Sequence, residues 1–129
     1  MLLAVGDSVR LRDLATGRFL VLDFWYISCA PCMKALPQMQ PLADKYQDKG
    51  VSVIGINSFD QNNKTAIVQK LRDKGIVFPT LFSSRSLVDQ LGFNAFPRYL
   101  IIADKTRLLF SGFGTIADLD GVLSEQLGH

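Results

Sequence analysis

The stretch that decides the fold is Val21–Pro37, VLDFWYISCAPCMKALP. Its first residues are apolar and aromatic with a single acid, which is typical of a short buried strand, and from Ala30 onward the residues favour a helix. Cys29 and Cys32 lie where the end of that strand meets the first turn of the helix. Because ligands and reactive groups in open α/β sheets concentrate at the carboxyl ends of strands, this pair is the candidate functional site.

A helix N-terminus favours a thiolate, because its unpaired N–H groups and partial positive charge stabilise an anion. The dipole alone contributes about 0.3–1 kcal/mol, which lowers a thiol pKa by less than about one unit. N–H donors aimed at the sulfur lower it further, and a Cys-x-x-Cys turn can present them. Cys29, nearer the exposed turn, is predicted to be the nucleophile. Cys32 is predicted to be the thiol that resolves a mixed disulfide.

Other uses of the cysteine pair fit less well. A disulfide that closes a loop of about four residues stabilises the folded state by roughly 1.9 kcal/mol, against about 3 kcal/mol for a fifteen-residue loop. A disulfide placed for stability would therefore close a longer loop. A zinc site needs four ligands, and the only histidine is His129, the last residue. A c-type haem site needs histidine where Met33 stands. A copper(I) site that adds Met33 and Met39, or two inert core cysteines, are the alternatives left open.

The rest of the chain alternates strands and helices, as hydrophobic periodicity and capping residues indicate. This order, with a hairpin and a helix at the end, predicts an α/β fold whose mixed central sheet has helices on both faces. The expected elements are strands at Phe19–Trp25, Val51–Ile56 and about Phe78–Leu81, a hairpin of Tyr99–Ala103 and Arg107–Ser111, and helices at Ala30–Gly50, Asn62–Lys74, Ser84–Leu91 and Thr115–Leu127.

Composition narrows the function classes. A chain of 129 residues with 48% hydrophobic content is expected to form a single domain over residues 1–129. Its net charge of +2 without a long basic run gives no indication of nucleic-acid binding. Apolar runs are far shorter than the roughly 20 residues that span a bilayer, so no membrane contact is expected from this segment. The opening MLLAVGDSVR does not fit a signal peptide, so we expect either a cytoplasmic protein or, as favoured, a domain cut from a longer chain.

Val21–Pro37 resembles the strand–Cys-x-x-Cys–helix signature of the thioredoxin superfamily. The stretches LRDLATGRFLVLDFW and GVSVIGINSFDQNNKTAIVQKLRDKGIVFPTLF are similar to the TlpA-type, ResA-like branch, which inserts a helix and a short strand after the second main strand. LGFNAFPRYLIIADKTRLLFSGFG resembles the final section of the same family. The resemblance covers the chain from about Val9 and implies a thioredoxin fold.

The resemblance also implies roles for individual residues. Cys29 and Cys32 match the active-site pair, and Pro31 stands between them. Pro37 matches the proline that kinks the active-site helix. Asp23, six residues before Cys29, matches a buried carboxylate; an acid in an apolar strand has a raised pKa and is able to exchange a proton with Cys32. The plainer interpretation of Asp23 is an acid at a strand end that reaches solvent.

A substrate-binding surface is implied next to the cysteines. Pro97, preceded by Phe96, matches the cis-proline that lies opposite the pair and helps to hold an incoming substrate backbone. Trp25, Tyr26 and Phe96 are expected to form an apolar rim for protein substrates, although Trp25 also fits a core position.

Three positions depart from the family pattern. Ser28 stands where a tryptophan is usual, which removes apolar contact surface. Ala35 stands where many extracytoplasmic members carry a glutamate, so tuning of the pair is expected to fall to Asp23. Tyr26 stands where peroxiredoxins need threonine or serine, which weighs against a peroxidase.

The function implied is that of a thiol–disulfide oxidoreductase, with the reducing direction favoured, that needs no cofactor and no metal. Its expected partners are disulfide-containing proteins and an upstream thiol electron donor. The resemblance places it in the cell envelope or periplasm; a full-length chain would be cytoplasmic. The alternatives are a non-catalytic module that binds a metal or a partner and, less favoured, a thiol peroxidase.

Overall fold

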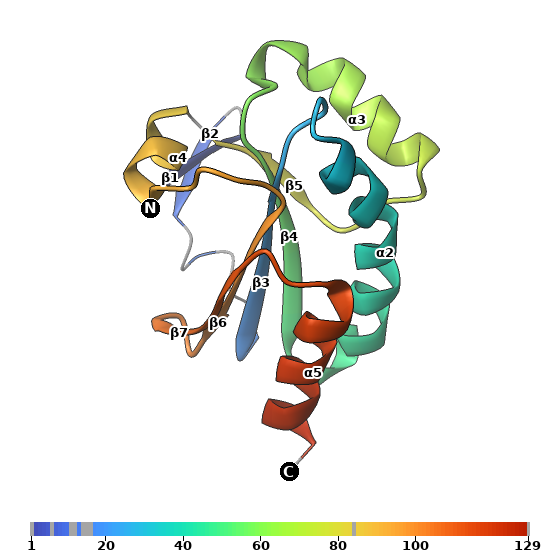
Figure 1. Cartoon of the computed structure of the whole chain (residues 1–129), viewed down its shortest axis with the longest axis vertical. Coiled ribbons are helices and arrows are strands. Elements are labelled where there is room, and N and C mark those ends of the chain that lie inside the picture. The colour runs from blue at the N-terminus through green and yellow to red at the C-terminus, as the bar shows by residue number, and fades with distance from the viewer. Residues whose placement is uncertain (1, 6, 11–12, 14–16, 84, 129) are drawn as a thin grey trace.

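The central feature of the fold is a seven-stranded mixed sheet with the strand order β2-β1-β5-β4-β3-β6-β7 (Figure 1). The computed structural model describes residues 2–5, 7–10, 13, 17–83 and 85–128. At its centre β3 (Phe19–Trp25) pairs in parallel with β4 (Val51–Asn57) and antiparallel with β6 (Arg98–Ala103). Every residue of β3 is buried, which confirms the buried strand predicted there.

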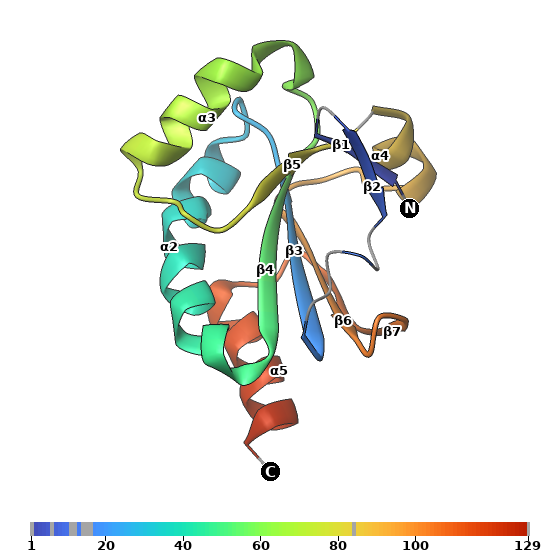
Figure 2. The same cartoon turned by 180° about the vertical axis from the view of Figure 1, so that it is seen from behind.

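Helices cover both faces of the sheet, as predicted (Figures 1 and 2). On one face lie α2 (Ala30–Tyr46), α3 (Lys64–Asp73) and α5 (Ile116–Leu127), whose buried side chains share a core cluster with those of β3. The other face carries a second cluster, and α4 (Arg85–Leu91) lies on that side. The sequence and the structure therefore agree on an α/β thioredoxin fold.

Local chemistry explains where the helices begin and end. Thr115 caps α5 with a reciprocal capping box, since its hydroxyl accepts from Asp118 N–H while the Asp118 carboxylate accepts from Thr115 N–H. After α2 the chain continues as a short 3₁₀ helix, Gln47–Lys49, and turns at Gly50, whose φ of 78° lies in the left-handed region. Pro37 lies inside α2, which spans it as a single helix.

The predicted insertion is present: the 3₁₀ helix η2 (Gln61–Asn63) leads into α3, and β5 (Thr80–Phe82) follows. The late hairpin consists of β6 and β7 (Arg107–Gly112), joined by a turn in which Asp104 and Lys105 have positive φ. Ser84, the predicted start of the helix before Gly92, lies outside the described residues.

The sequence did not indicate the hairpin of β1 (Leu2–Val5) and β2 (Asp7–Arg10). Strand β1 joins the sheet by pairing with β5 at Ala4 and Phe82. Two four-residue strands are too short for periodicity to reveal, and tertiary pairing determines them.

Candidate active site

The two cysteines form a disulfide at the junction of β3 and α2, with their Cα atoms 5.2 Å apart. Strand β3 ends at Trp25, and a turn leads to Cys29, the residue that caps α2. Cys32 lies in the first turn of that helix, with Pro31 before it. The structure therefore places both cysteines where the sequence predicted them, at the carboxyl end of a central strand.

The surroundings of Cys29 favour a negative charge on its sulfur. Cys29 Sγ accepts a hydrogen bond from Cys32 N–H at 3.2 Å, and this is the N–H donor that the sequence led us to expect. The sulfur also lies at the positive end of the dipole of α2. Cys29 is 6% exposed and Cys32 1%, so Cys29 is the more accessible of the two residues.

Asp23 lies within β3, on the same face of the sheet as Trp25 and the core under α2. It is 1% exposed, so the plainer interpretation of an acid reaching solvent is wrong. Burial raises the pKa of its carboxyl to about 7, and its Oδ1 has no hydrogen-bond partner among the described residues. Its neighbour Tyr99 on β6 has a phenol pKa raised by burial and, further, by the charge of Asp23. The pKa of the Asp23 carboxyl therefore lies near neutral pH, well above the ordinary value of an aspartate.

The Phe96–Pro97 peptide bond is cis, as the family resemblance implied. Phe96 is half-buried and packs against both core clusters. Its ring also contacts Tyr26, with centroids 5.3 Å apart.

Phe59, in the connection that follows β4, completes an aromatic cluster with Tyr26 and Phe96. Its ring centroid lies 5.0 Å from that of Tyr26 and 5.5 Å from that of Phe96. Phe59 is 41% exposed, whereas Trp25 is fully buried. The rim predicted from Trp25, Tyr26 and Phe96 is corrected accordingly: Trp25 belongs to the core, and Phe59 provides exposed ring surface. The sequence did not single out Phe59, since its position beside Tyr26 depends on the parallel pairing of β3 with β4.

A network of hydrogen bonds connects the turn before Cys29 to the segment that follows β4. Ile27 N–H donates to Asp60 Oδ2 at 2.8 Å. The buried side chain of Asn57 donates to the same carboxylate oxygen at 2.8 Å and accepts from Asp60 N–H at 2.9 Å. The sequence did not indicate this network, although an asparagine and an aspartate three residues apart at a strand end are typical of such a turn.

The remaining positions singled out in the sequence lie around this junction. Pro31, Pro37 and Ser28 are exposed, and Ala35 is half-buried. Among the described residues, no group of three or more histidine, cysteine, aspartate or glutamate side chains could hold a metal ion. In the same part of the chain, no helix has the length and apolar character to cross a membrane.

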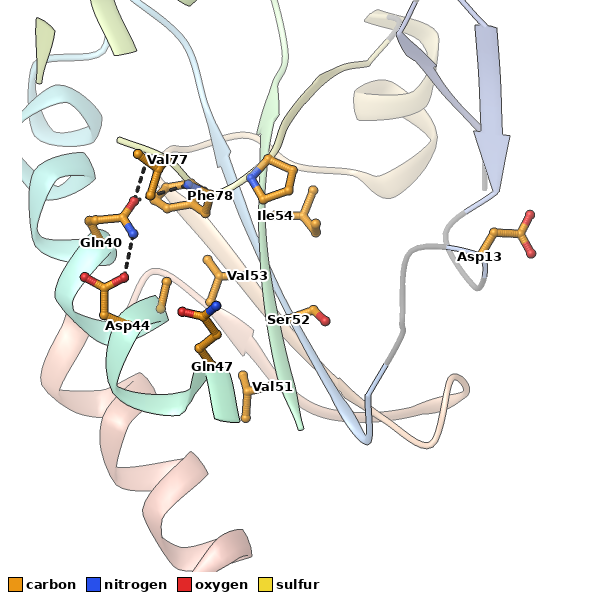
Figure 3. A pocket seen from close by; sticks show the side chains of 12 residues that line it. Asp13, Gln40, Asp44, Gln47, Val51, Ser52, Val53, Ile54, Val77 and Phe78 are labelled. Carbon is orange, nitrogen blue, oxygen red and sulfur yellow. Dashed lines mark hydrogen bonds between the residues drawn. The ribbon is translucent and has the colours of Figure 1, made fainter. Parts of the chain in front are cut away.

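A separate hollow of about 510 Å³ lies along α2 and the early part of β4 (Figure 3). Its lining includes Gln40 and Asp44 on α2, Val53 on β4, and Val77 and Phe78 before β5. Gln40 Oε1 accepts from the N–H groups of Val77 and Phe78, and its amide donates to Asp44. Neither cysteine lines this hollow.

Comparison with known proteins matches this chain to the Redoxin family over residues 3–122. Thiol-disulfide oxidoreductase ResA from Halalkalibacterium halodurans is 32% identical over 124 residues, which cover 95% of this chain and 64% of that protein. The chain thus spans less than two thirds of the length of this relative.

Solved structures share the fold. The thioredoxin domain of a thiol-disulfide oxidoreductase from Bacteroides vulgatus superposes with a TM-score of 0.83 at 16% identity, covering 98% of this chain and 92% of that one. A DsbF homologue from Corynebacterium diphtheriae gives a TM-score of 0.76 at 27% identity, covering 92% of this chain and 78% of that one.

Proposed function

Because this chain belongs to the Redoxin family and has a ResA-like thioredoxin fold, we propose that it is a thiol–disulfide oxidoreductase that uses Cys29 and Cys32. The observation that carries the proposal is a disulfide at the N-terminus of α2 in which Cys29 Sγ accepts Cys32 N–H. The ResA relative is named for the same activity.

The exchange runs in two steps in the reducing direction. The Cys29 thiolate attacks one sulfur of a partner disulfide, a mixed disulfide forms, and the other partner sulfur leaves as a thiolate and takes a proton. Cys32, after losing its proton, attacks Cys29 Sγ and forms the intramolecular disulfide, while the second partner thiolate departs and is protonated. Two electrons pass to the partner, and a thiol donor restores the dithiol.

Asp23 is the group proposed to accept the proton of Cys32. A general base works best when its pKa lies near the working pH, and the pKa of about 7 satisfies this condition. The orphaned Oδ1 of this buried carboxyl is free to take a proton without breaking a hydrogen bond within the described residues.

The aromatic cluster of Tyr26, Phe59 and Phe96 is the proposed contact surface for a protein substrate. Tyr26 directly follows the end of β3, and its C=O accepts a hydrogen bond from Cys29 N–H at 3.2 Å. Pro97, next to Phe96, is proposed to hold the substrate backbone. The cluster supplies apolar contact surface in a chain where Ser28 stands in place of the tryptophan usual in the family.

The proposal also includes that this protein reduces its partners and that it lies in the cell envelope. Both rest on the resemblance of the sequence to the TlpA-type, ResA-like branch. The proposed partners are disulfide-containing proteins and an upstream thiol donor.

The first test equilibrates the purified protein in glutathione buffers of defined potential and measures the oxidation state of the two cysteines. We expect a reversible two-electron transition, closer to about −270 mV, as in thioredoxin, than to about −120 mV, as in DsbA. A midpoint near the latter value would reverse the direction. Absence of a reversible disulfide would refute the proposal and favour a non-catalytic binding module, which copper(I) binding under competition would identify. Fast consumption of peroxide that depends on Cys29 would instead indicate a peroxidase.

A further inference from the structure

Hydrogen bonds link the turn from Tyr26 to Cys29, and the strand end before it, to the connection that follows β4. Ser58 N–H donates to Trp25 C=O at 2.9 Å, and Ile27 N–H donates to Asp60 Oδ2 at 2.8 Å. The second bond joins residues 33 positions apart in the chain. It anchors the turn two residues before the reactive sulfur.

Asp60 is itself fixed in place. Its carboxylate and its N–H exchange hydrogen bonds with the side chain of Asn57, which is fully buried. Its C=O accepts from Asn63 N–H at 2.9 Å, at the end of η2. Because Oδ2 accepts from both Asn57 and Ile27, the position of the carboxylate determines the position of the Ile27 amide.

The conformation of this turn bears on how readily the disulfide closes. The Cα atoms of Cys29 and Cys32 are 5.2 Å apart, within the usual range of about 4.4–6.8 Å for a disulfide. A turn held in this conformation keeps the reduced cysteines close together. Their high effective concentration then favours the disulfide over the dithiol.

We propose that Asp60 is a positioning residue for the cysteine pair: its carboxylate, through Ile27 N–H, holds the turn in the conformation that the disulfide requires. The inference rests on the proposed thiol–disulfide function and deepens it, since a turn that favours the oxidised form makes the reduced protein a stronger electron donor. Asp60 acts through Ile27 and touches neither sulfur.

Three variants separate this role from a general contribution to stability. Asp60→Ala removes the acceptor of the Ile27 amide. Asp60→Asn retains a side-chain oxygen that can accept from Ile27 and Asn57, without the charge. Asp118→Ala is the matched control, because Asp118 accepts a comparable bond from Thr115 N–H at 2.7 Å in the cap of α5.

The experiment measures, for the wild type and each variant, the midpoint potential in glutathione buffers and the thermal unfolding midpoint of the oxidised protein. For Asp60→Ala we expect the equilibrium constant for disulfide formation to fall about tenfold, which shifts the potential by about 30 mV in the positive direction. Asp60→Asn stays within about twofold of the wild type. Asp118→Ala lowers the unfolding midpoint but leaves the potential unchanged.

The outcomes are distinct. A wild-type protein without a reversible disulfide refutes the proposed function itself. A wild-type protein that cycles, with the potential of Asp60→Ala unchanged, overturns the positioning role and leaves Asp60 a loop anchor. A shift in Asp60→Asn as large as in Asp60→Ala overturns it too, because the charge would then be responsible. If Asp60→Ala does not fold, Asp60→Ser is measured against the same criteria.

Discussion

Replacing Asp23 with asparagine tests the buried carboxyl through the pH dependence of stability. The pKa of Asp23 is raised from 3.8 to about 7 by burial. Between these two values the folded protein holds a proton that the unfolded chain has lost, so the free energy of unfolding falls as pH rises. A rise of about three pH units, at roughly 1.4 kcal/mol per unit, gives about 4 kcal/mol lost by pH 8.

Asparagine does not titrate, so Asp23→Asn removes this loss. We expect the free energy of unfolding of the variant, relative to the wild type, to be constant below about pH 4, to rise between pH 4 and 7, and to be level above pH 7. The gain across this window is expected to be about 3–4 kcal/mol. Changes in hydrogen bonding caused by the amide add a constant offset, which the comparison across pH removes.

The assay is urea unfolding of the oxidised protein at one-unit steps from pH 4 to pH 8. The disulfide stays intact, so neither cysteine titrates. Tyr99, whose pKa is raised further above its ordinary value, stays neutral over this range. The exposed Asp89→Asn serves as the control for exchanging a carboxylate for an amide at the surface. A flat difference for Asp23→Asn would show that the carboxyl does not titrate near neutral pH, and would remove the basis for its role as a proton acceptor.

Three further predictions, which use four substitutions, test the site and the core around it. Cys32→Ala should accumulate mixed disulfides with protein partners, detected on non-reducing gels, while Cys29→Ala accumulates none; equal trapping by both would reverse or abolish the assigned roles. Phe59→Ala should raise KM for a protein disulfide by about three- to tenfold, as expected for roughly 1 kcal/mol of lost apolar contact. Its rate of exchange with glutathione disulfide should stay within about twofold of the wild type. An equal effect on both substrates would exclude Phe59 from docking. Gly55→Ala should lower the free energy of unfolding in urea by about 1–3 kcal/mol. The reason is that a Cβ there would lie 3.0 Å from Thr80 Oγ1 and 3.2 Å from a ring carbon of Phe78. An unchanged free energy of unfolding would mean that the core relaxes around the methyl group.

The sequence was sufficient for the parts of the fold that local chemistry determines. The bounds of β3, the cap at Thr115 and the turn at Gly50 all follow from apolar runs, capping side chains and glycine. The disulfide pair follows from its spacing at the strand–helix junction. These features depend on neighbours in the chain, which a single sequence displays.

The parts that could not be predicted depend on which strands pair. Phe59 meets Tyr26 only because β4 lies parallel to β3, with Asn57 in register with Trp25. The same register brings Asp60 to Ile27. Hydrophobic periodicity predicts that two strands exist, but it does not give their register or the side chains that meet beyond their ends.

Asp23 is the one residue of β3 that is not apolar. Every other residue in the strand is a buried apolar side chain, and a carboxyl among them, at a loss of roughly 4 kcal/mol by pH 8, removes a large share of the net stability of about 5–15 kcal/mol typical of a domain. A strand selected for packing alone would carry an apolar residue at this position. The same burial that lowers stability places the pKa at about 7, where a carboxyl can both accept and release a proton. This cost in packing and stability is what the proposed role of Asp23 as a proton acceptor would explain, because functional sites are where an otherwise regular element departs from the rule of apolar packing.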